Sequence, residues 1–225
     1  MRPRNMKISQ PVSHVVFDLD GVLLDTERLY TEATQAVLDE FGKRYTWEVK
    51  KHMMGRSELV SAQILIDWFQ IPLTPGEYLE RRNEVLYRLI GASEPLEGAP
   101  ELVALLHQQQ VPMAIATSSR RTVFERKTGH HEWLAPIREV VCGDDPEVGA
   151  FKPAPDIFLV AARRLGTEPS HCVVFEDSPA GVAAAIAAGM QVVAVADPSL
   201  DASVFEGAEL VIRGYDELRL EDLGF

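Results

Sequence analysis

Residues 14–27 read HVVFDLDGVLLDTE, a stretch in which a strand pattern runs directly into two aspartates. Residues 15–17 are β-branched or aromatic, which is typical of a strand buried on both faces of a parallel sheet. Asp18 and Asp20 follow at once, and in extended chain two residues that lie two positions apart point to the same side. Their carboxylates would therefore repel each other, so some other group has to compensate this repulsion.

The composition describes a globular protein with an excess of acidic groups. The chain has 225 residues, enough for one core or for a core with a small second domain. Hydrophobic residues make up 46% and charged residues 25%, which argues against a disordered chain. The net charge of -12 makes a nucleic acid polymer a poor partner. A small phosphorylated metabolite is compatible with this charge, because a local metal ion or lysine can reverse the field at a site.

Three features of the sequence favour a cytoplasmic protein that does not enter a membrane. Residues 1–13 contain basic side chains but no apolar segment of the kind found in secretory signals. The apolar segment 182–196 is shorter than the about 20 residues that a membrane span needs. Cys142 and Cys172, if they lie on neighbouring parallel strands, would be offset by about four residues, or roughly 13 Å, which is too far for a disulfide.

The chain from residue 25 to residue 92 has helical periodicity throughout. Apolar residues between positions 29 and 41 recur at helical spacing, and further helices are expected at about 47–54, 57–69 and 75–90. Because no strand pattern separates them, these four helices predict a small helical bundle.

From about residue 92 onward, strand and helix patterns alternate. The segment GASEPLEGAP, rich in glycine and proline, is expected to be a hinge. Repeated β–α units predict a parallel sheet covered by helices on both sides. We therefore expect an α/β fold whose Rossmann-like core consists of residues 1–24 and 93–225, with residues 25–92 as an inserted helical-bundle domain. The strands are expected at 111–116, 138–142, 172–175, 192–196 and 209–212, and the helices at 101–109, 122–127, 155–165 and 180–188.

Polar side chains collect where the expected strands end, and ligands bind beyond the carboxyl ends of the strands in an open parallel sheet. Several acids at one edge favour a hard divalent cation with oxygen ligands, which is the preference of Mg2+. Lys152 lies in the loop before a helix, where it is placed to reach the same edge. A metal ion, a lysine and hydroxyl groups together make a phosphoryl site. The residues after the strands are Asp18 and Asp20, then Thr117, Ser118 and Ser119, then Asp144 and Asp145, then Glu176, Asp177 and Ser178, and last Asp197.

Such a site explains the two aspartates that follow the first strand. Asp18, kept ionised by the metal ion and Lys152, can attack phosphorus and form an acyl phosphate, which divides one difficult displacement into two easier ones. Asp20 can protonate the leaving alkoxide and then take a proton from the water that hydrolyses the intermediate. The backbone carbonyl of Asp20 would face the metal ion.

Four chemistry-bearing stretches follow one another along the chain: FDLDGVLLDTE, ATSS, FKPAPDIF and VFEDSPAGVAAAIAAGM. In this order they resemble the motifs of the haloacid dehalogenase-like superfamily of phosphohydrolases, and the helical bundle is similar to the small cap domain of that family. The resemblance implies a magnesium-dependent phosphomonoesterase that acts on a small phosphorylated metabolite. It further implies that Asp18 is the nucleophile and Asp20 the acid and base, that Thr117, Ser118 and Lys152 bind the phosphoryl oxygens, and that Asp18, Asp20, Asp177 and, directly or through water, Glu176 hold Mg2+.

The sequence also leaves other functions of this fold to be weighed. Enzymes that resemble β-phosphoglucomutase, a phosphotransferase, carry a histidine and an arginine where this chain aligns Tyr30 and Glu58, which argues against that activity. A dehalogenase would lack the second acid, Asp20. A non-catalytic phosphate-binding protein would be expected to have lost an acid or the lysine, whereas a sugar phosphate phosphatase would keep them all. We expect a monomer.

Several of these residues also have purely structural interpretations. Thr117 and Ser118 could instead cap the helix that begins at about residue 122, and Asp177 could cap the helix that begins at about residue 180. Asp144 and Asp145 are expected to shape their loop rather than to bind a metal ion. The sequence does not decide whether six residues of the helical domain pack the bundle or face a substrate: Tyr30, Trp47, Met53, Met54, Arg56 and Glu58.

Overall fold

The computed structural model describes residues 8, 11–53, 58–197 and 200–224. The chain divides into two compact units. One combines Met1–Asp25 with Glu94–Phe225, and the other is Thr26–Ser93. Each unit has hydrophobic clusters of its own, so each is described by itself.

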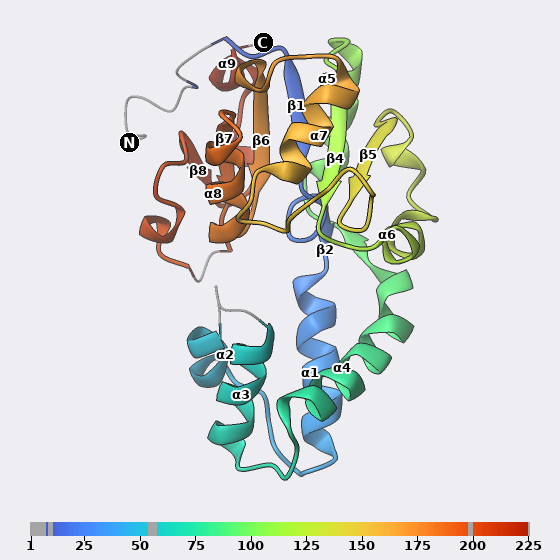
Figure 1. The fold of residues 1–225 in the computed structure, drawn as a ribbon, viewed down its shortest axis with the longest axis vertical. Coiled ribbons are helices and arrows are strands. Elements are labelled where there is room, and N and C mark those ends of the chain that lie inside the picture. Colours follow the sequence, from blue (N-terminus) through green and yellow to red (C-terminus); the bar gives the residue numbers. More distant parts are fainter. Residues whose placement is uncertain (1–7, 9–10, 54–57, 198–199, 225) are drawn as a thin grey trace. The chain divides into compact units, whose positions relative to one another are not determined.

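A six-stranded parallel sheet forms the centre of the first unit (Figure 1). The order of its strands is β5-β4-β1-β6-β7-β8, so the first strand of the chain lies between two strands that come much later. This arrangement confirms the parallel α/β sheet that the sequence predicted. The strands are β1 (His14–Phe17), β4 (Met113–Thr117), β5 (Glu139–Cys142), β6 (Cys172–Glu176), β7 (Gln191–Val195) and β8 (Leu210–Ile212).

Helices cover both faces of the sheet, and alternate residues of β1 pack into different cores. Val15 and Phe17 join the apolar cluster that contains the buried face of α5, whereas Val16 joins the cluster that contains α7 and α8. All three side chains are fully buried, which the apolar run before Asp18 had indicated. The helices of this unit are α5 (Ala99–Gln108), α6 (Arg121–Thr128), α7 (Asp156–Leu165), α8 (Pro179–Ala187) and α9 (Leu220–Leu223), with short 3-10 turns η2 (Glu132–Leu134), η3 (Pro169–His171), η4 (Ala202–Phe205) and η5 (Tyr215–Glu217).

The described residues of the second unit form a bundle of four α-helices, as the periodicity predicted. Its buried apolar residues form two clusters. Tyr78 belongs to one of them, and its hydroxyl lies 3.2 Å from the hydroxyl of Thr34. A capping box of Thr74 and Glu77 begins the last helix. The elements are α1 (Glu27–Asp39), α2 (Trp47–Met53), α3 (Glu58–Phe69), α4 (Pro75–Leu89) and the short turn η1 (Ile90–Ala92).

A short antiparallel ribbon marks the places where the chain leaves and re-enters the α/β unit. Its strands are β2 (Leu24–Asp25) and β3 (Glu94–Pro95), with Leu24 opposite Pro95. The segment GASEPLEGAP, which the sequence suggested as a hinge, therefore pairs with residues 24–25. Among the helices of the described residues, none combines the length and the apolar character that crossing a membrane requires.

The prediction that the two cysteines lie on neighbouring strands was wrong. Cys142 ends β5 and Cys172 begins β6, and both β4 and β1 lie between these strands. Three strand spacings amount to roughly 14 Å. Both cysteines are free and buried, and this separation across the sheet adds to the expected offset along the strands.

Candidate active site

The loop that follows β1 is held against the neighbouring strand by its backbone. The amide of Asp18 donates to the carbonyl of Phe175 in β6, and the amide of Gly21 donates to the carbonyl of Leu24, both at 2.9 Å. Gly21 has a φ of +73°, and a Cβ atom at this position would lie 2.1 Å from the Oδ2 atom of Asp177. Glycine is therefore required here both for its backbone conformation and for the carboxylate packed against it.

Lys152 contacts residues at the carboxyl ends of three strands, β1, β4 and β6. Its Nζ atom lies 2.5 Å from Oδ1 of Asp18 and 2.7 Å from Oε1 of Glu176, and it donates to the carbonyl of Ala116 at 3.3 Å. The ammonium group also lies 4.9 Å from the centre of the Phe158 ring. Burial opposes the charge of Lys152, but the two carboxylates outweigh it and raise the pKa of the lysine. The lysine thus remains charged in a buried position.

Glu176 is fixed by the turn that begins α8. Its Oε2 atom accepts from the amide of Ser178 at 2.6 Å and from the Ser178 hydroxyl at 2.9 Å. A Cβ atom on Gly181 would lie only 1.7 Å from Oε1 of Glu176, so the carboxylate packs directly against the first turn of the helix. Ser178, not Asp177, caps α8, because its hydroxyl accepts from the amide of Gly181 at 3.0 Å.

Asp18, Glu176 and Asp177 form a cluster in which one oxygen of each carboxylate lies within 4.8 Å of the others. Burial raises the pKa of Asp18 to about 7; Lys152 opposes this rise, and the charge of Glu176 adds to it. Burial, together with the charges of Glu176 and Asp18, also holds the pKa of Asp177 well above its usual value. Three crowded carboxylates with oxygen donors only are a set that suits a hard divalent cation.

Asp20 is held by a second lysine, Lys127 of α6. The Nζ atom of Lys127 lies 2.5 Å and 2.7 Å from the two carboxylate oxygens of Asp20 and 2.8 Å from the hydroxyl of Ser119. Ser119 in turn donates to Oδ2 of Asp20 at 3.2 Å. The structure therefore brings Ser119 to Asp20. Ser118, which the family resemblance assigns to the phosphoryl oxygens, is exposed.

Lys127 was not predicted from the sequence as a site residue, although one signal for it was present. Val123 and Phe124 are apolar residues of α6, and Phe124 packs against the core cluster that contains β1. Lys127 follows them by four and three residues and therefore lies on the same face of the helix. A lysine in that position is buried unless the helix turns away from the sheet.

Thr117 ends β4 and is fully buried, and its hydroxyl accepts from the amide of Ser119 at 3.1 Å. Neither Thr117 nor Ser118 caps the following helix. Arg120 precedes α6, and the amide of Arg121 donates instead to Oδ1 of Asp144 at 2.8 Å. The hydroxyl of Thr117 thus stabilises the turn that follows β4 at the carboxyl end of the sheet.

A second acidic cluster, Cys142 with Asp144 and Asp145, has a structural explanation. Asp145 accepts from both Arg121 and Arg164 at 2.9 Å, so its charge is already compensated. Burial raises the pKa of the Cys142 thiol to about 11, which disfavours the thiolate that a soft metal ion would need. These acids shape their loop, in agreement with the interpretation that the sequence favoured.

Two candidate residues of the helical unit, Tyr30 and Glu58, contact the same arginine. Arg82 is buried, its guanidinium lies 5.5 Å from the centre of the Tyr30 ring, and it forms a 2.6 Å ion pair with Glu58. Met53 packs against the apolar cluster of the bundle, and Trp47 is 43% exposed. Two further candidates, Met54 and Arg56, lie outside the described residues.

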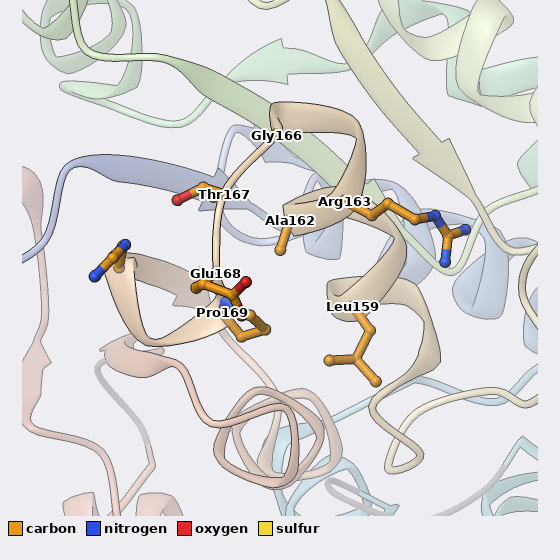
Figure 2. A pocket seen from close by; sticks show the side chains of 8 residues that line it. Leu159, Ala162, Arg163, Gly166, Thr167, Glu168 and Pro169 are labelled. Atoms are coloured by element: carbon orange, nitrogen blue, oxygen red, sulfur yellow. The ribbon is translucent and has the colours of Figure 1, made fainter.

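A pocket of about 560 Å³ lies at the other end of the sheet (Figure 2). It is bordered by the C-terminal half of α7 and by the turn η3 that leads into β6, whereas the acidic cluster lies at the end of that strand. A strand of five residues separates the two places, or roughly 16 Å. The acidic cluster therefore does not line this pocket, whose walls include Leu159, Arg163, Thr167, Glu168 and His171.

Comparisons with known proteins agree with this arrangement. A model of haloacid dehalogenase-like hydrolases matches residues 15–195. The chain is 42% identical, over 97% of its length and 96% of the relative, to a probable pseudouridine-5'-phosphatase of Drosophila melanogaster. It is 41% identical, over 95% of its length and 91% of the relative, to (DL)-glycerol-3-phosphatase 2 of Arabidopsis thaliana. A crystal structure of a HAD family hydrolase from Deinococcus radiodurans R1, with bound phosphate and sodium, has a TM-score of 0.79 at 30% identity, covering 95% of this chain and 97% of that one.

The chain belongs to the haloacid dehalogenase-like hydrolase family, as its four ordered motifs indicated. Within that family it is a phosphatase. The stretches DTERLYTEA, AQILID and GDDPEV also resemble pseudouridine-5'-phosphatase, and the similarity to the fly protein agrees with this resemblance.

Proposed function

We propose that this protein is a magnesium-dependent phosphomonoesterase that forms an aspartyl phosphate on Asp18. One observation carries the proposal: the Asp18 carboxylate lies 2.5 Å from the ammonium group of Lys152 and, at the same time, within the cluster of Glu176 and Asp177. A carboxylate in such a place is oriented and has its charge compensated without being blocked by a bidentate arginine. These are the requirements of a nucleophile that attacks a phosphoryl group.

The reaction would proceed in two displacements. In the first, an Asp18 oxygen bonds to phosphorus as the bond from phosphorus to the leaving oxygen breaks, and Asp20 gives its proton to that oxygen. In the second, Asp20 takes a proton from water, the water oxygen bonds to phosphorus, and the bond to Asp18 breaks. Lys152 and Thr117 would bind the phosphoryl oxygens during both steps, with Ser118 and Ser119 at the same edge.

The residues at the acidic cluster fit a bound Mg2+. Asp18 and Asp177 supply carboxylate oxygens, whereas Glu176 already accepts from Lys152 and Ser178 and so would act mainly by orienting its neighbours. The backbone carbonyl of Asp20 would complete the protein ligands. When bound, the ion would reduce the repulsion between the phosphoryl oxygens and the carboxylates.

The substrate would be a small phosphorylated metabolite, and pseudouridine 5'-phosphate is the first candidate. The similarity to the fly protein supports it, and the equally strong similarity to the plant glycerol-3-phosphatase supports a polyol or sugar phosphate as the alternative. Residues 25–92 would form the cap that closes over the leaving group and excludes large phosphoproteins. Glu58 and Tyr30, which stand where the mutases carry an arginine and a histidine, both contact Arg82 of their own unit. These contacts give no support to a phosphotransferase activity.

The test is phosphate release from a panel of monoesters, each with Mg2+ or with a chelator. The panel contains pseudouridine 5'-phosphate, uridine 5'-phosphate, glycerol 3-phosphate, hexose 6-phosphates and 4-nitrophenyl phosphate. Asp18→Asn is compared with Asp67→Asn, which changes an exposed aspartate of α3. We expect activity that requires Mg2+, is lost in Asp18→Asn and is kept in Asp67→Asn.

The intermediate has a test of its own. Acid quenching during turnover, followed by mass spectrometry, should find a phosphoryl group on the peptide that contains Asp18. Turnover of the esters without any phosphoryl group on this peptide would contradict the covalent mechanism. Full activity of folded Asp18→Asn, or of the chelated enzyme, would contradict the proposed site.

A further inference from the structure

Lys127 is a buried lysine for which the reaction described above has no use. Its side chain is only 1% exposed, whereas the side chain of its partner Asp20 is 29% exposed. The lysine contacts both carboxylate oxygens of Asp20 and the hydroxyl of Ser119, so three oxygen atoms of two side chains lie at one ammonium. Burying a lysine is costly unless it is paired, and an aliphatic side chain of similar length would fill the same space without that cost.

The two aspartates after β1 therefore each have a lysine of their own. Lys152 contacts Asp18 and Glu176, and Lys127 contacts Asp20. The cluster with the spacing of a cation site comprises Asp18, Glu176 and Asp177, while the Asp20 carboxylate is directed to Lys127. The repulsion expected from two acids on the same side of a strand is thus resolved by separate partners.

We propose that Lys127 is a positioning residue for Asp20, which holds the Asp20 carboxylate away from the acidic cluster and in reach of the leaving oxygen. This inference rests on the proposed phosphatase mechanism, in which Asp20 transfers the proton. Two contacts from Lys127 and one from Ser119 restrict the carboxylate to one orientation, while its partial exposure leaves it open to a substrate. Without the lysine, the Asp20 carboxylate can rotate toward the cation site, where it can no longer give its proton to the leaving oxygen.

The leaving group separates this role from a merely structural one. An alkoxide leaves only when it receives a proton, whereas 4-nitrophenolate leaves well without one. The ratio kcat/KM covers the steps up to release of the alcohol, so it does not include hydrolysis of the aspartyl phosphate. General acid catalysis contributes about 10²- to 10⁴-fold. Loss of Lys127 should therefore lower kcat/KM for alkyl esters much more than for the aryl ester.

The experiment compares Lys127→Met with wild type on the best alkyl monoester of the panel and on 4-nitrophenyl phosphate. We expect kcat/KM to fall about 100-fold for the alkyl ester and by less than about 5-fold for the aryl ester. Arg126→Met, which changes the exposed neighbour in the same helix, should alter neither value. In an Asp20→Asn background, Lys127→Met should add little to the loss already present.

Equal losses on both esters, or no loss on either, would overturn the inference while leaving the phosphatase assignment intact. If Lys127→Met does not fold, Ser119→Ala decides, because it removes one contact to Asp20 and keeps the lysine. We expect Ser119→Ala to show a smaller loss that is still selective for the alkyl ester, and an unselective effect would count against the inference. A wild-type protein that hydrolyses neither ester would instead show that the proposed function itself is wrong.

Discussion

The two ends of strand β6 differ in chemistry although both are buried. At the start of the strand, Cys172 is fully buried and its thiol lies 3.8 Å from the carbonyl of Glu168. At the end, Glu176 is equally buried but contacts Lys152 and the turn at Ser178. Buried charges seldom improve stability over apolar side chains, so their concentration at one end indicates function. In this sheet the amino-terminal ends of the strands, here called the amino edge, contribute to stability. Their carboxyl-terminal ends, the carboxyl edge, carry the groups for catalysis.

The largest effect should follow from replacing the lysine at the carboxyl edge. Lys152→Met removes the ammonium that Asp18 and Glu176 share, and we expect kcat/KM to fall on the order of 10³-fold for alkyl and aryl esters alike. Arg163→Met changes a cation at the pocket of the amino edge, where its ion pair with Glu147 is exposed, and should leave kcat/KM within about 2-fold. Steady-state kinetics of the two variants, with circular dichroism to verify folding, tests the comparison. A strong loss of kcat/KM in Arg163→Met would contradict the assignment of catalysis to the carboxyl edge alone.

Substitutions of two glycines, one at each edge, should have effects of intermediate size on kcat and on stability. Gly181→Ala places a methyl group where the Glu176 carboxylate lies, so we expect about a 100-fold loss of kcat with modest loss of stability. Gly166→Ala meets no atom within 4 Å, but Gly166 ends α7 with a φ of +71°. It should cost about 1 kcal/mol of stability and no activity. Kinetics and urea unfolding of both variants measure the two effects, and the reverse pattern would refute the assignment of the two edges.

The acidic cluster should make the stability of the metal-free protein depend on pH. The folded pKa of Asp18 is about 7 against an ordinary value of 3.8, so between these values the folded state binds more protons than the unfolded chain. Stability from this group is complete below the ordinary pKa and is lost as the pH rises through about 7. With a chelator present, the Tm of wild type should therefore fall relative to that of Asp18→Asn over this range.

Mg2+ should reverse this trend, because a bound cation favours the ionised carboxylates. We expect the rise in Tm on adding Mg2+ to be several degrees larger above pH 7 than near pH 5. Differential scanning fluorimetry at a series of pH values measures both effects. A difference in Tm between wild type and Asp18→Asn that stays constant with pH would contradict the raised pKa.

The smallest effects are expected at the amino edge. Burial raises the pKa of Cys172 to about 12, so its thiol should react slowly with a thiol reagent at neutral pH until the protein unfolds. Cys172→Ala should cost about 1 kcal/mol of unfolding free energy and leave kcat/KM unchanged. Labelling rates and urea midpoints check this prediction. Fast labelling of the native protein would show that this end of the sheet opens.

The sequence predicted the elements of the core well because each carries its own periodic signal. The buried β1 was indicated by three apolar residues before Asp18, and the helical unit by four successive stretches of helical spacing. Asp18, Glu176 and Lys152 were expected together because each follows a strand or precedes a helix at the carboxyl edge. Details that depend on side-chain direction were predicted less well: Ser178 rather than Asp177 caps α8, and the contact of Ser119 with Asp20 was not predicted.

By itself, the sequence determined the class of fold and the family, because hydrophobic periodicity and ordered motifs are local properties of the chain. Only the tertiary structure decided which strands are neighbours, and so placed Cys142 and Cys172 on opposite sides of β1 and β4. It also brought Lys127 to Asp20 across 107 residues of sequence. Contacts of this kind depend on how a helix lies on the sheet, which no spacing within one segment specifies.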